Sequence, residues 1–231
     1  MDEATKASVV EYTLVSREFC YTLFQRVFAE EPSKELFEVL FSQETEDQLA
    51  ILGKDCEALN ALSELFSSLK AQNHEQLVSD LGCEYVRLFI GPGNLSVPPW
   101  ESIHITGKQL MFQKETLDVR NAYRVEGFLP VGYPSVADDH IAIEASFMQK
   151  LAEKSVKAFL SNDLEECIRL LDVQKNFLER HLSRWLPKYS RQLSELNRPH
   201  ALYPVTAVCF NEFVIWDMQL IDELKEHTIA P

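Results

Sequence analysis

The amino-acid sequence predicts an all-α protein, and three observations indicate this fold class. Apolar residues recur three and four positions apart along most of the 231-residue chain, which is the spacing of one helix face. Glycine is scarce, at 7 residues, whereas sheet proteins with many short strands use glycine-rich turns. No segment shows sustained alternation of polar and apolar residues between turn signals. We therefore expect a single globular domain over residues 1–231, built from roughly nine or ten helices.

The N-terminal part is expected to contain four helices. The first ends before Pro32, and its apolar stripe consists of Phe19, Cys20, Leu23, Phe24, Val27 and Phe28. Ser33 is a suitable N-cap for the second helix, whose apolar face is formed by Leu36, Phe37, Leu40 and Phe41. A third helix carries Leu59, Leu62, Phe66 and Leu69. Asn73 and Gln76 resemble a capping box, which opens a helix that ends at Ile90.

The middle of the chain is expected to hold two short helices and a linker. After a loop, the pattern predicts helical pieces near Gln109–Gln113 and around Glu115–Glu126. Residues 127–137 contain two Gly and two Pro, so they cannot form a regular helix. We expect them to form a hinge-like linker between two sub-halves of the domain, residues 1–126 and 138–231.

The C-terminal sub-half is expected to be helical to its end. A long helix begins near Asp138, with that residue as N-cap, and Asn162 or Asp163 caps the next one. Pro187 is expected to interrupt the helical pattern. Pro199 precedes the final helix, whose apolar residues are Val205, Val208, Phe213, Trp216, Leu220 and Leu224.

Charge and cysteine usage restrict the class of protein. The formal net charge of -14 repels phosphate backbones, so we expect no nucleic-acid partner and a preference for basic ones, although acidic surfaces also serve solubility alone. The five cysteines form no C-x-x-C pair, which is typical of a reducing compartment. The first residues do not resemble a signal peptide, and no apolar run approaches the roughly 18 residues of a membrane span. The sequence thus predicts a cytoplasmic protein without an integral membrane segment.

The strongest candidate site is an apolar helix end that is followed by a stiff loop. Tyr85, Leu88 and Phe89 share one helix face, and Gly91-Pro92-Gly93 ends that helix. The segment Pro98-Pro99-Trp100 then holds the chain extended before a large aromatic side chain. Such a surface suits a peptide. The alternative is that the same side chains belong to the core.

A second cluster, Asp138-Asp139-His140, directly follows the linker. Both carboxylates suit a helix N-terminus, whereas the direction of any shift in the pKa of His140 stays open. His140 and Glu144 share a helix face and could begin a metal site, but zinc needs a further ligand, and no candidate lies nearby. Nucleophile-elbow and phosphate-loop spacings are also missing. We therefore expect no catalytic, metal-binding or cofactor-binding residues.

Taken together, these motifs resemble the TorD/DmsD/NarJ family of redox-enzyme maturation chaperones, and most closely its DmsD/TorD branch. The similarity extends over nearly the whole chain, and the family fold is all-helical. The residues that carry it are Tyr85-x-x-Leu88-Phe89-x-Gly91-Pro92, Pro98-Pro99-Trp100-Glu101-Ser102, Asp139-His140 and Trp185-Leu186-Pro187-Lys188-Tyr189.

The resemblance implies a system-specific chaperone in the cytoplasm and not an enzyme. Members of this family bind the twin-arginine signal peptide and precursor of a molybdenum-containing oxidoreductase, and they delay Tat export until the cofactor is inserted. Contacts with the Tat or cofactor-insertion machinery are also implied. Guanine-nucleotide binding has been proposed for some members, but this sequence gives it no support, and we expect no cofactor. The peptide-binding residues implied by the match are Tyr85, Leu88, Phe89, Pro99, Trp100, Asp139 and His140.

Two departures from the family pattern leave questions open. Tyr85 stands where a close relative has Trp, and Ser135-Val136-Ala137 stands where Glu and Pro usually precede the Asp-His pair. Because this hinge permits domain-swapped dimers in some relatives, both a monomer and a domain-swapped dimer stay open. Two other functions also remain as alternatives. One is a helical assembly factor for a partner without a twin-arginine signal, and the other is a metal-dependent hydrolase that uses Asp139, His140 and Glu144.

Overall fold

The structure is a computed structural model that describes residues 3–91, 95–133, 136–196 and 199–229. Its first half contains α1 (Glu3–Ala29), α2 (Lys34–Leu40), α3 (Gln43–Leu52), α4 (Glu57–Lys70) and α5 (His74–Tyr85), which continues as the π-helical η1 (Val86–Ile90). The second half contains α6 (Glu101–Thr106), α7 (Lys114–Val125), α8 (Ile141–Leu160), α9 (Leu164–Phe177), the π-helical η2 (Leu178–Leu182), α10 (Ser183–Ser194) and α11 (Leu202–Ile229). When continuous helices are counted once, the described residues form ten and include no strand, which confirms the all-α prediction.

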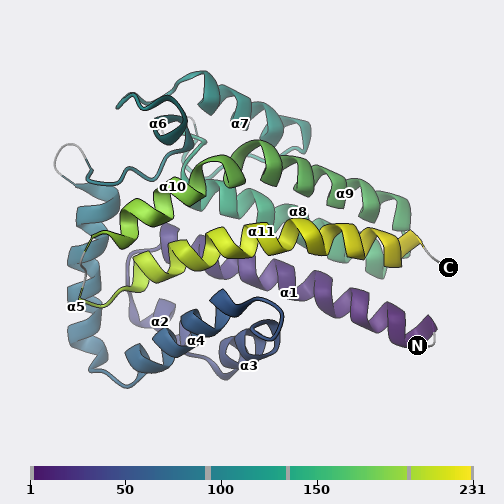
Figure 1. The fold of residues 1–231 in the computed structure, drawn as a ribbon, viewed down its shortest axis with the longest axis horizontal. Helices are drawn as coiled ribbons and strands as arrows, with labels where there is room; N and C mark the ends of the chain where they lie inside the picture. Colours follow the sequence, from purple (N-terminus) through teal and green to yellow (C-terminus); the bar gives the residue numbers. More distant parts are fainter. Residues whose placement is uncertain (1–2, 92–94, 134–135, 197–198, 230–231) are drawn as a thin grey trace.

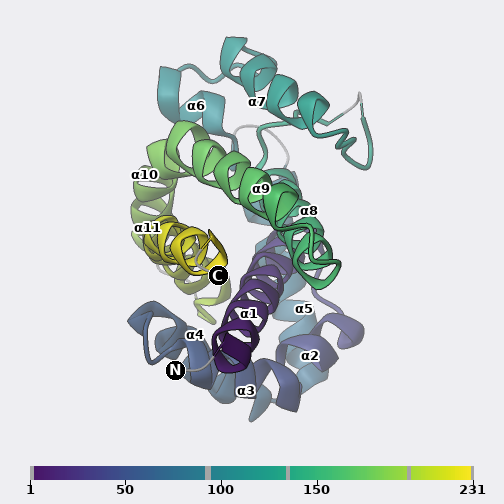
Figure 2. The ribbon, with the colours of Figure 1, turned by 90° about the vertical axis from the view of Figure 1, so that its right-hand side faces the viewer.

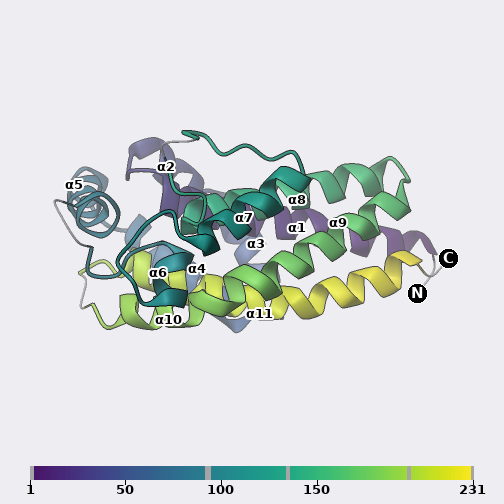
Figure 3. The ribbon, with the colours of Figure 1, turned by 90° about the horizontal axis from the view of Figure 1, so that it is seen from above.

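The long helices lie side by side in the middle of the molecule. α1 packs along α8, α8 along α9, and α11 along α10, α4 and α1. Figure 2 shows this group with α2–α5 on one side and α6 and α7 on the other. In the view from above (Figure 3), α5 lies across one end of the group. The organisation as one domain with two sub-halves stays a prediction, although α1 and α8 come from different sub-halves.

The core is rich in aromatic side chains that join α1 to α11. Phe24 and Phe210 stack with their ring centroids 4.5 Å apart, and Tyr21 meets Phe213 edge to face at 5.3 Å. Large rings bury much apolar area, and such pairs add to the stability gained by burial alone. The apolar stripe predicted for the first helix therefore faces the last helix of the chain.

An ion pair crosses this core between α1 and α11. Arg17 Nε lies 2.5 Å from Asp217 Oδ1, and the two side chains are 1% and 0% exposed. Tyr21 donates its hydroxyl hydrogen to Asp217 Oδ2 at 2.6 Å, and Arg17 Nη2 donates to Gln174 Oε1 at 2.8 Å. Gln174 in turn donates to the Ser155 hydroxyl at 2.8 Å. These bonds satisfy buried polar groups that would otherwise destabilise the fold, and they join α1, α8, α9 and α11.

Three predicted helix starts are confirmed. The Ser33 hydroxyl accepts a hydrogen bond from the Leu36 amide at 3.1 Å, as expected for the N-cap of α2. Asn73 accepts from two amides at the start of α5, and Asp163 accepts from the Glu166 amide at 3.1 Å at the start of α9. The expectation that residues 127–137 form no regular helix is also confirmed for the described part of this segment, whereas its role as a hinge between sub-halves stays a prediction.

Two predictions about the middle of the chain are wrong. The short helix is not near Gln109–Gln113 but is α6, because the carboxylate of Asp139 accepts from the Ser102 amide and supplies a distant N-cap. Asp138 is not the N-cap of the long helix α8, because its carboxylate pairs with Arg120. The N-cap is His140, whose Nδ1 accepts from the Ala142 amide at 3.1 Å.

Two further differences lie in helices. Pro187 does not interrupt the chain but lies inside α10, because Trp185, Leu186 and Tyr189 are fully buried there, and burial outweighs one lost hydrogen bond. The helix α3 was not expected, since its apolar pattern is weak; Ser42 opens it by accepting from the Thr45 amide at 3.1 Å. Pro92 and Gly93 of the predicted helix stop, and Pro134 and Ser135 of the hinge, lie outside the described residues.

Candidate functional site

A short antiparallel bridge brings the two sequence motifs together. The Ile141 amide donates to the Pro99 carbonyl at 2.9 Å, and the Glu101 amide donates to the Asp139 carbonyl at 2.9 Å. Trp100 and His140 are the bridged pair, and their rings meet nearly perpendicular with centroids 5.6 Å apart. The extended conformation expected around the Pro-Pro pair is what allows this pairing.

The rings of Tyr85 and Phe89 extend the pair into a larger aromatic cluster. Phe89 lies 6.4 Å from His140 and 5.0 Å from Tyr85 between ring centroids. Tyr203 of α11 completes the cluster at 5.2 Å from Phe89; sequence reasoning missed it, because a residue of the last helix gives no local signal. We call Tyr85, Phe89, Trp100, His140 and Tyr203 the aromatic cluster.

The members of the cluster differ in exposure. Trp100 and His140 are half-buried, and Tyr85 and Phe89 are each 9% exposed. Leu88 and Pro99, which were also expected to line the site, are buried. The Trp100 Nε1 atom is buried and has no hydrogen-bond partner among the described residues. The structure thus brings the expected residues together, and Trp100 and His140 are the ones that are partly exposed at the surface.

The helix that carries Phe89 ends in a π-helical turn. The Gly91 amide bonds to the Val86 carbonyl at 2.6 Å, one residue further back than in an α-helix. Gly91 has φ +36°, and a Cβ atom there would lie 2.8 Å from Leu95 Cδ2. Any other residue at this position would meet both backbone strain and a clash. The glycine predicted to stop the helix is therefore required by the backbone conformation at this position.

Asp139 has a structural role that the sequence did not indicate. Its side chain is fully buried, and Oδ2 accepts from the Ser102 amide at 2.9 Å at the start of α6. Its Oδ1 has no hydrogen-bond partner in the described part of the chain. The carboxylate therefore points into the protein, and its expected contact with an arginine of a partner stays a prediction.

Two substitutions of Asp139 test its role in capping α6. Asp139→Ala removes the N-cap of α6, and we expect it to lower the free energy of unfolding by about 1–2 kcal/mol. Asp139→Asn keeps an acceptor for the Ser102 amide. We expect it to lower the free energy of unfolding by only a few tenths of a kcal/mol. Chemical denaturation of both variants checks this. Equal destabilisation by Ala and Asn would contradict the capping role.

His140 is uncharged at neutral pH. Burial lowers its pKa from 6.5 to about 4, and its Nδ1 accepts a hydrogen bond and so carries no proton. The question that the sequence left open is therefore answered by burial, which outweighs the neighbouring carboxylates. A neutral imidazole does not repel a basic partner at this surface.

An acidic cluster lies beneath the bridge. Glu101 is 1% exposed, and its Oε2 lies 3.0 Å from His181 Nδ1. Glu144 is fully buried, and its Oε2 accepts from Trp185 Nε1 at 3.3 Å. Burial raises the pKa of both carboxyl groups, and for Glu144 the nearby charges of Glu101 and Asp139 raise it further. The cluster joins α6, α8, η2 and α10 below the candidate site.

Glu144→Gln is expected to stabilise the protein increasingly as the pH rises. The pKa of Glu144 is higher in the folded than in the unfolded state, so the folded state binds more protons and loses stability as pH increases above about 4.5. Glutamine removes this loss and still accepts from Trp185. Denaturation of both proteins between about pH 5 and pH 8 measures the effect. A difference that shrinks with rising pH would contradict it.

The remaining neighbours hold the motif Asp138-Asp139-His140 in place. Arg120 of α7 pairs with Asp138 at 2.6 Å, and the Tyr123 hydroxyl donates to the Asp138 carbonyl at 3.0 Å. His140 Nδ1 accepts from the Ala142 amide, and Glu144 Oε2 accepts from Trp185 Nε1. Among the described residues, no group of three or more His, Cys, Asp and Glu is arranged to hold a metal ion.

None of the described helices is long and apolar enough to cross a membrane.

Comparison with known proteins gives consistent results. A family model described as nitrate reductase delta subunit matches residues 43–191. The chaperone protein TorD of Vibrio cholerae serotype O1 is 26% identical over 175 residues, which cover 74% of this chain and 72% of the relative. The chaperone protein TorD of a Psychrobacter species is 23% identical over 218 residues, which cover 91% and 94%.

A solved structure also resembles the chain. It is described as a redox enzyme maturation protein from Archaeoglobus fulgidus, and it superposes with a TM-score of 0.50 at 22% identity. The superposition covers 86% of this chain and 93% of that one. At this level of identity the similarity concerns the fold, and it agrees with the all-helical architecture.

Proposed function

The chain belongs to the nitrate reductase delta subunit family, and from this premise we propose that it binds the twin-arginine signal peptide of a molybdenum-containing oxidoreductase. Membership makes the chain a redox-enzyme maturation chaperone and not an enzyme. The proposal adds that it acts in the cytoplasm and retains the precursor until the cofactor is inserted and Tat export can begin. Contacts with the export or cofactor-insertion machinery, and a monomeric or domain-swapped state, belong to the same proposal.

The half-buried pair Trp100–His140 is the observation that carries this proposal. An indole face next to an uncharged imidazole offers apolar area to an aliphatic side chain and a cation–π contact to an arginine. The net charge of -14 attracts a basic peptide and accelerates its encounter with the protein.

Calorimetry with a synthetic twin-arginine peptide tests the proposal. We expect Trp100→Ala to weaken binding at least tenfold, because central aromatic residues dominate such interfaces. Trp216→Ala is the matched control, since this half-buried tryptophan lies on α11 and contacts Phe213 instead of the aromatic cluster. A peptide with both arginines replaced by glutamine is expected to bind more weakly than the parent peptide. If the glutamine peptide binds equally well, the arginines do not contribute to binding. Unchanged affinity in Trp100→Ala would show that the Trp100 ring does not contact the peptide.

A further inference from the structure

A second groove lies between α7 and α9, outside the aromatic cluster. Its volume is about 520 Å³, which is within the range of binding pockets for small ligands and peptide side chains. Phe147 of α8 and Phe177 and Val173 of α9 form an apolar floor, and Val125 of α7, which is 82% exposed, forms part of the opposite wall. Figure 1 shows α7 lying alongside α9.

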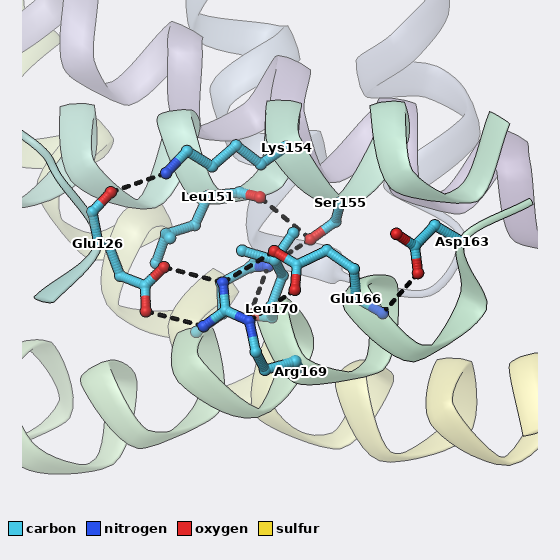
Figure 4. A network of polar contacts seen from close by, with 9 residues as sticks. Glu126, Leu151, Lys154, Ser155, Asp163, Glu166, Arg169 and Leu170 are labelled. Carbon is cyan, nitrogen blue, oxygen red and sulfur yellow. Dashed lines mark hydrogen bonds and ion pairs between the residues drawn. The ribbon is translucent and has the colours of Figure 1, made fainter. Parts of the chain in front are cut away.

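The walls of this groove are fastened to each other at one end. Arg169 of α9 binds both carboxylate oxygens of Glu126, at 2.9 and 3.0 Å, directly after α7 ends. The Glu126 carbonyl accepts from Lys154 of α8 at 2.8 Å. Figure 4 shows Glu126 held between these two side chains. Because Glu126 is 8% exposed and the pair is bidentate, the spacing between α7 and α9 is set before any partner arrives.

Two side-chain amides face the groove from opposite walls. Asn121 of α7 and Asn176 of α9 are both exposed, and neither forms a hydrogen bond within the described part of the chain. A side-chain amide offers a donor and an acceptor, which match the carbonyl and N–H of a peptide unit. An extended segment needs such partners for its backbone, whereas a helix satisfies its own. The two asparagines therefore favour an extended occupant.

The charges of the groove favour an apolar segment with few charges of its own. Arg169 is neutralised by Glu126 and Glu166, and Asp172 by Lys225. Of the remaining charged residues in its lining, Asp118 and Arg180 have no ion-pair partner among the described residues. They carry opposite charges and lie on different elements, so the net field in the groove is small.

The groove also shares one residue with the buried layer beneath the candidate site. His181 lines its inner end and contacts Glu101, which directly follows Trp100 in the chain. We propose that the groove between α7 and α9 binds the apolar stretch of the client peptide in extended form, with Asn121 and Asn176 pairing with its backbone. This inference rests on the proposed function, because the arginine pair of the same peptide would occupy the surface around Trp100 and His140.

The test uses two peptides of equal length with the full protein. One is the twin-arginine peptide with its apolar stretch, and the other has that stretch replaced by Gly and Ser. We expect the first to bind wild type at least tenfold more tightly. The double variant Asn121→Ala/Asn176→Ala is expected to lose about thirtyfold in affinity for the first peptide only, since two lost hydrogen bonds at about 1 kcal/mol each correspond to that factor. Gln219→Ala, an exposed amide on α11 outside the groove, is the matched control.

The outcomes separate this inference from the proposed function. The inference about the groove is wrong if wild type binds the two peptides with equal affinity, or if the double variant binds the first peptide as tightly as wild type does. In either case the proposed function stands. If wild type binds neither peptide, both are overturned. If the double variant instead changes the molecular mass in light scattering and leaves peptide affinity unchanged, the groove is an interface between two copies, and the inference is wrong.

Discussion

Arg17→Ala is expected to lower the free energy of unfolding by about 3–5 kcal/mol, because it leaves the carboxylate of Asp217 buried without its counter-ion. Asp217 is fully buried and would keep only the Tyr21 hydroxyl as a hydrogen-bond partner among the described residues. Gln174 also loses the donor at its Oε1. Such a loss is a large part of the total stability of a typical domain. Urea denaturation followed by circular dichroism measures it.

A paired replacement is the control for this prediction. Arg17→Met with Asp217→Leu removes both charges and leaves no uncompensated ion, so we expect it to recover most of the stability lost in Arg17→Ala. Recovery is incomplete, because Tyr21 and Gln174 still lose partners. If the double variant is no more stable than Arg17→Ala, the unpaired charge is not the cause of the loss.

Trp185→Ala is expected to cost about 3–5 kcal/mol through the loss of a fully buried aromatic side chain. Its ring stacks over His104 with centroids 5.5 Å apart and lies 5.3 Å from Tyr189. Its Nε1 is also the partner of Glu144 below the candidate site. Thermal unfolding measures the loss, and a small change would show that neighbouring side chains fill the space.

The conservative variant Trp185→Phe separates the loss of the aromatic ring from the loss of the indole N–H. It keeps an aromatic ring in the core and removes the indole N–H. We expect the free energy of unfolding to fall by about 1–3 kcal/mol, because the buried Glu144 acceptor is left unpaired. When Glu144 is replaced by Gln, its amide group can turn to another partner. In that background we expect Trp185→Phe to lower the free energy of unfolding by less. Additive effects of the two changes would show that Trp185 and Glu144 are not coupled.

The sequence predicted those parts of the fold that are determined locally. Ser33, Asn73 and Asp163 cap helices as expected, because a cap depends on a few neighbouring residues. The position of α6 could not be predicted, since its cap is the side chain of Asp139, 37 residues away in the chain. Pro187 was misjudged because tertiary burial overrides local propensity.

The candidate site was predictable in its residues but not in its arrangement. The motifs around Trp100 and His140 identified the segments, yet only the hydrogen bonds between them place the two rings together. Periodicity could not tell that Leu88 faces inward. It also gave no sign of the pairing between Glu101 and His181, which depends on the position of α6 relative to η2.

The central claim is that a twin-arginine peptide binds at Trp100, and the indole N–H signals in nuclear magnetic resonance spectra test it most directly. The chain has three tryptophans, so three indole signals are expected, and Trp100→Phe identifies one of them. The account predicts that the peptide shifts the Trp100 signal, because it changes the surroundings of the indole ring, and leaves the signal of Trp216, which packs on Phe213, in place. An unchanged Trp100 signal at saturating peptide would contradict the account.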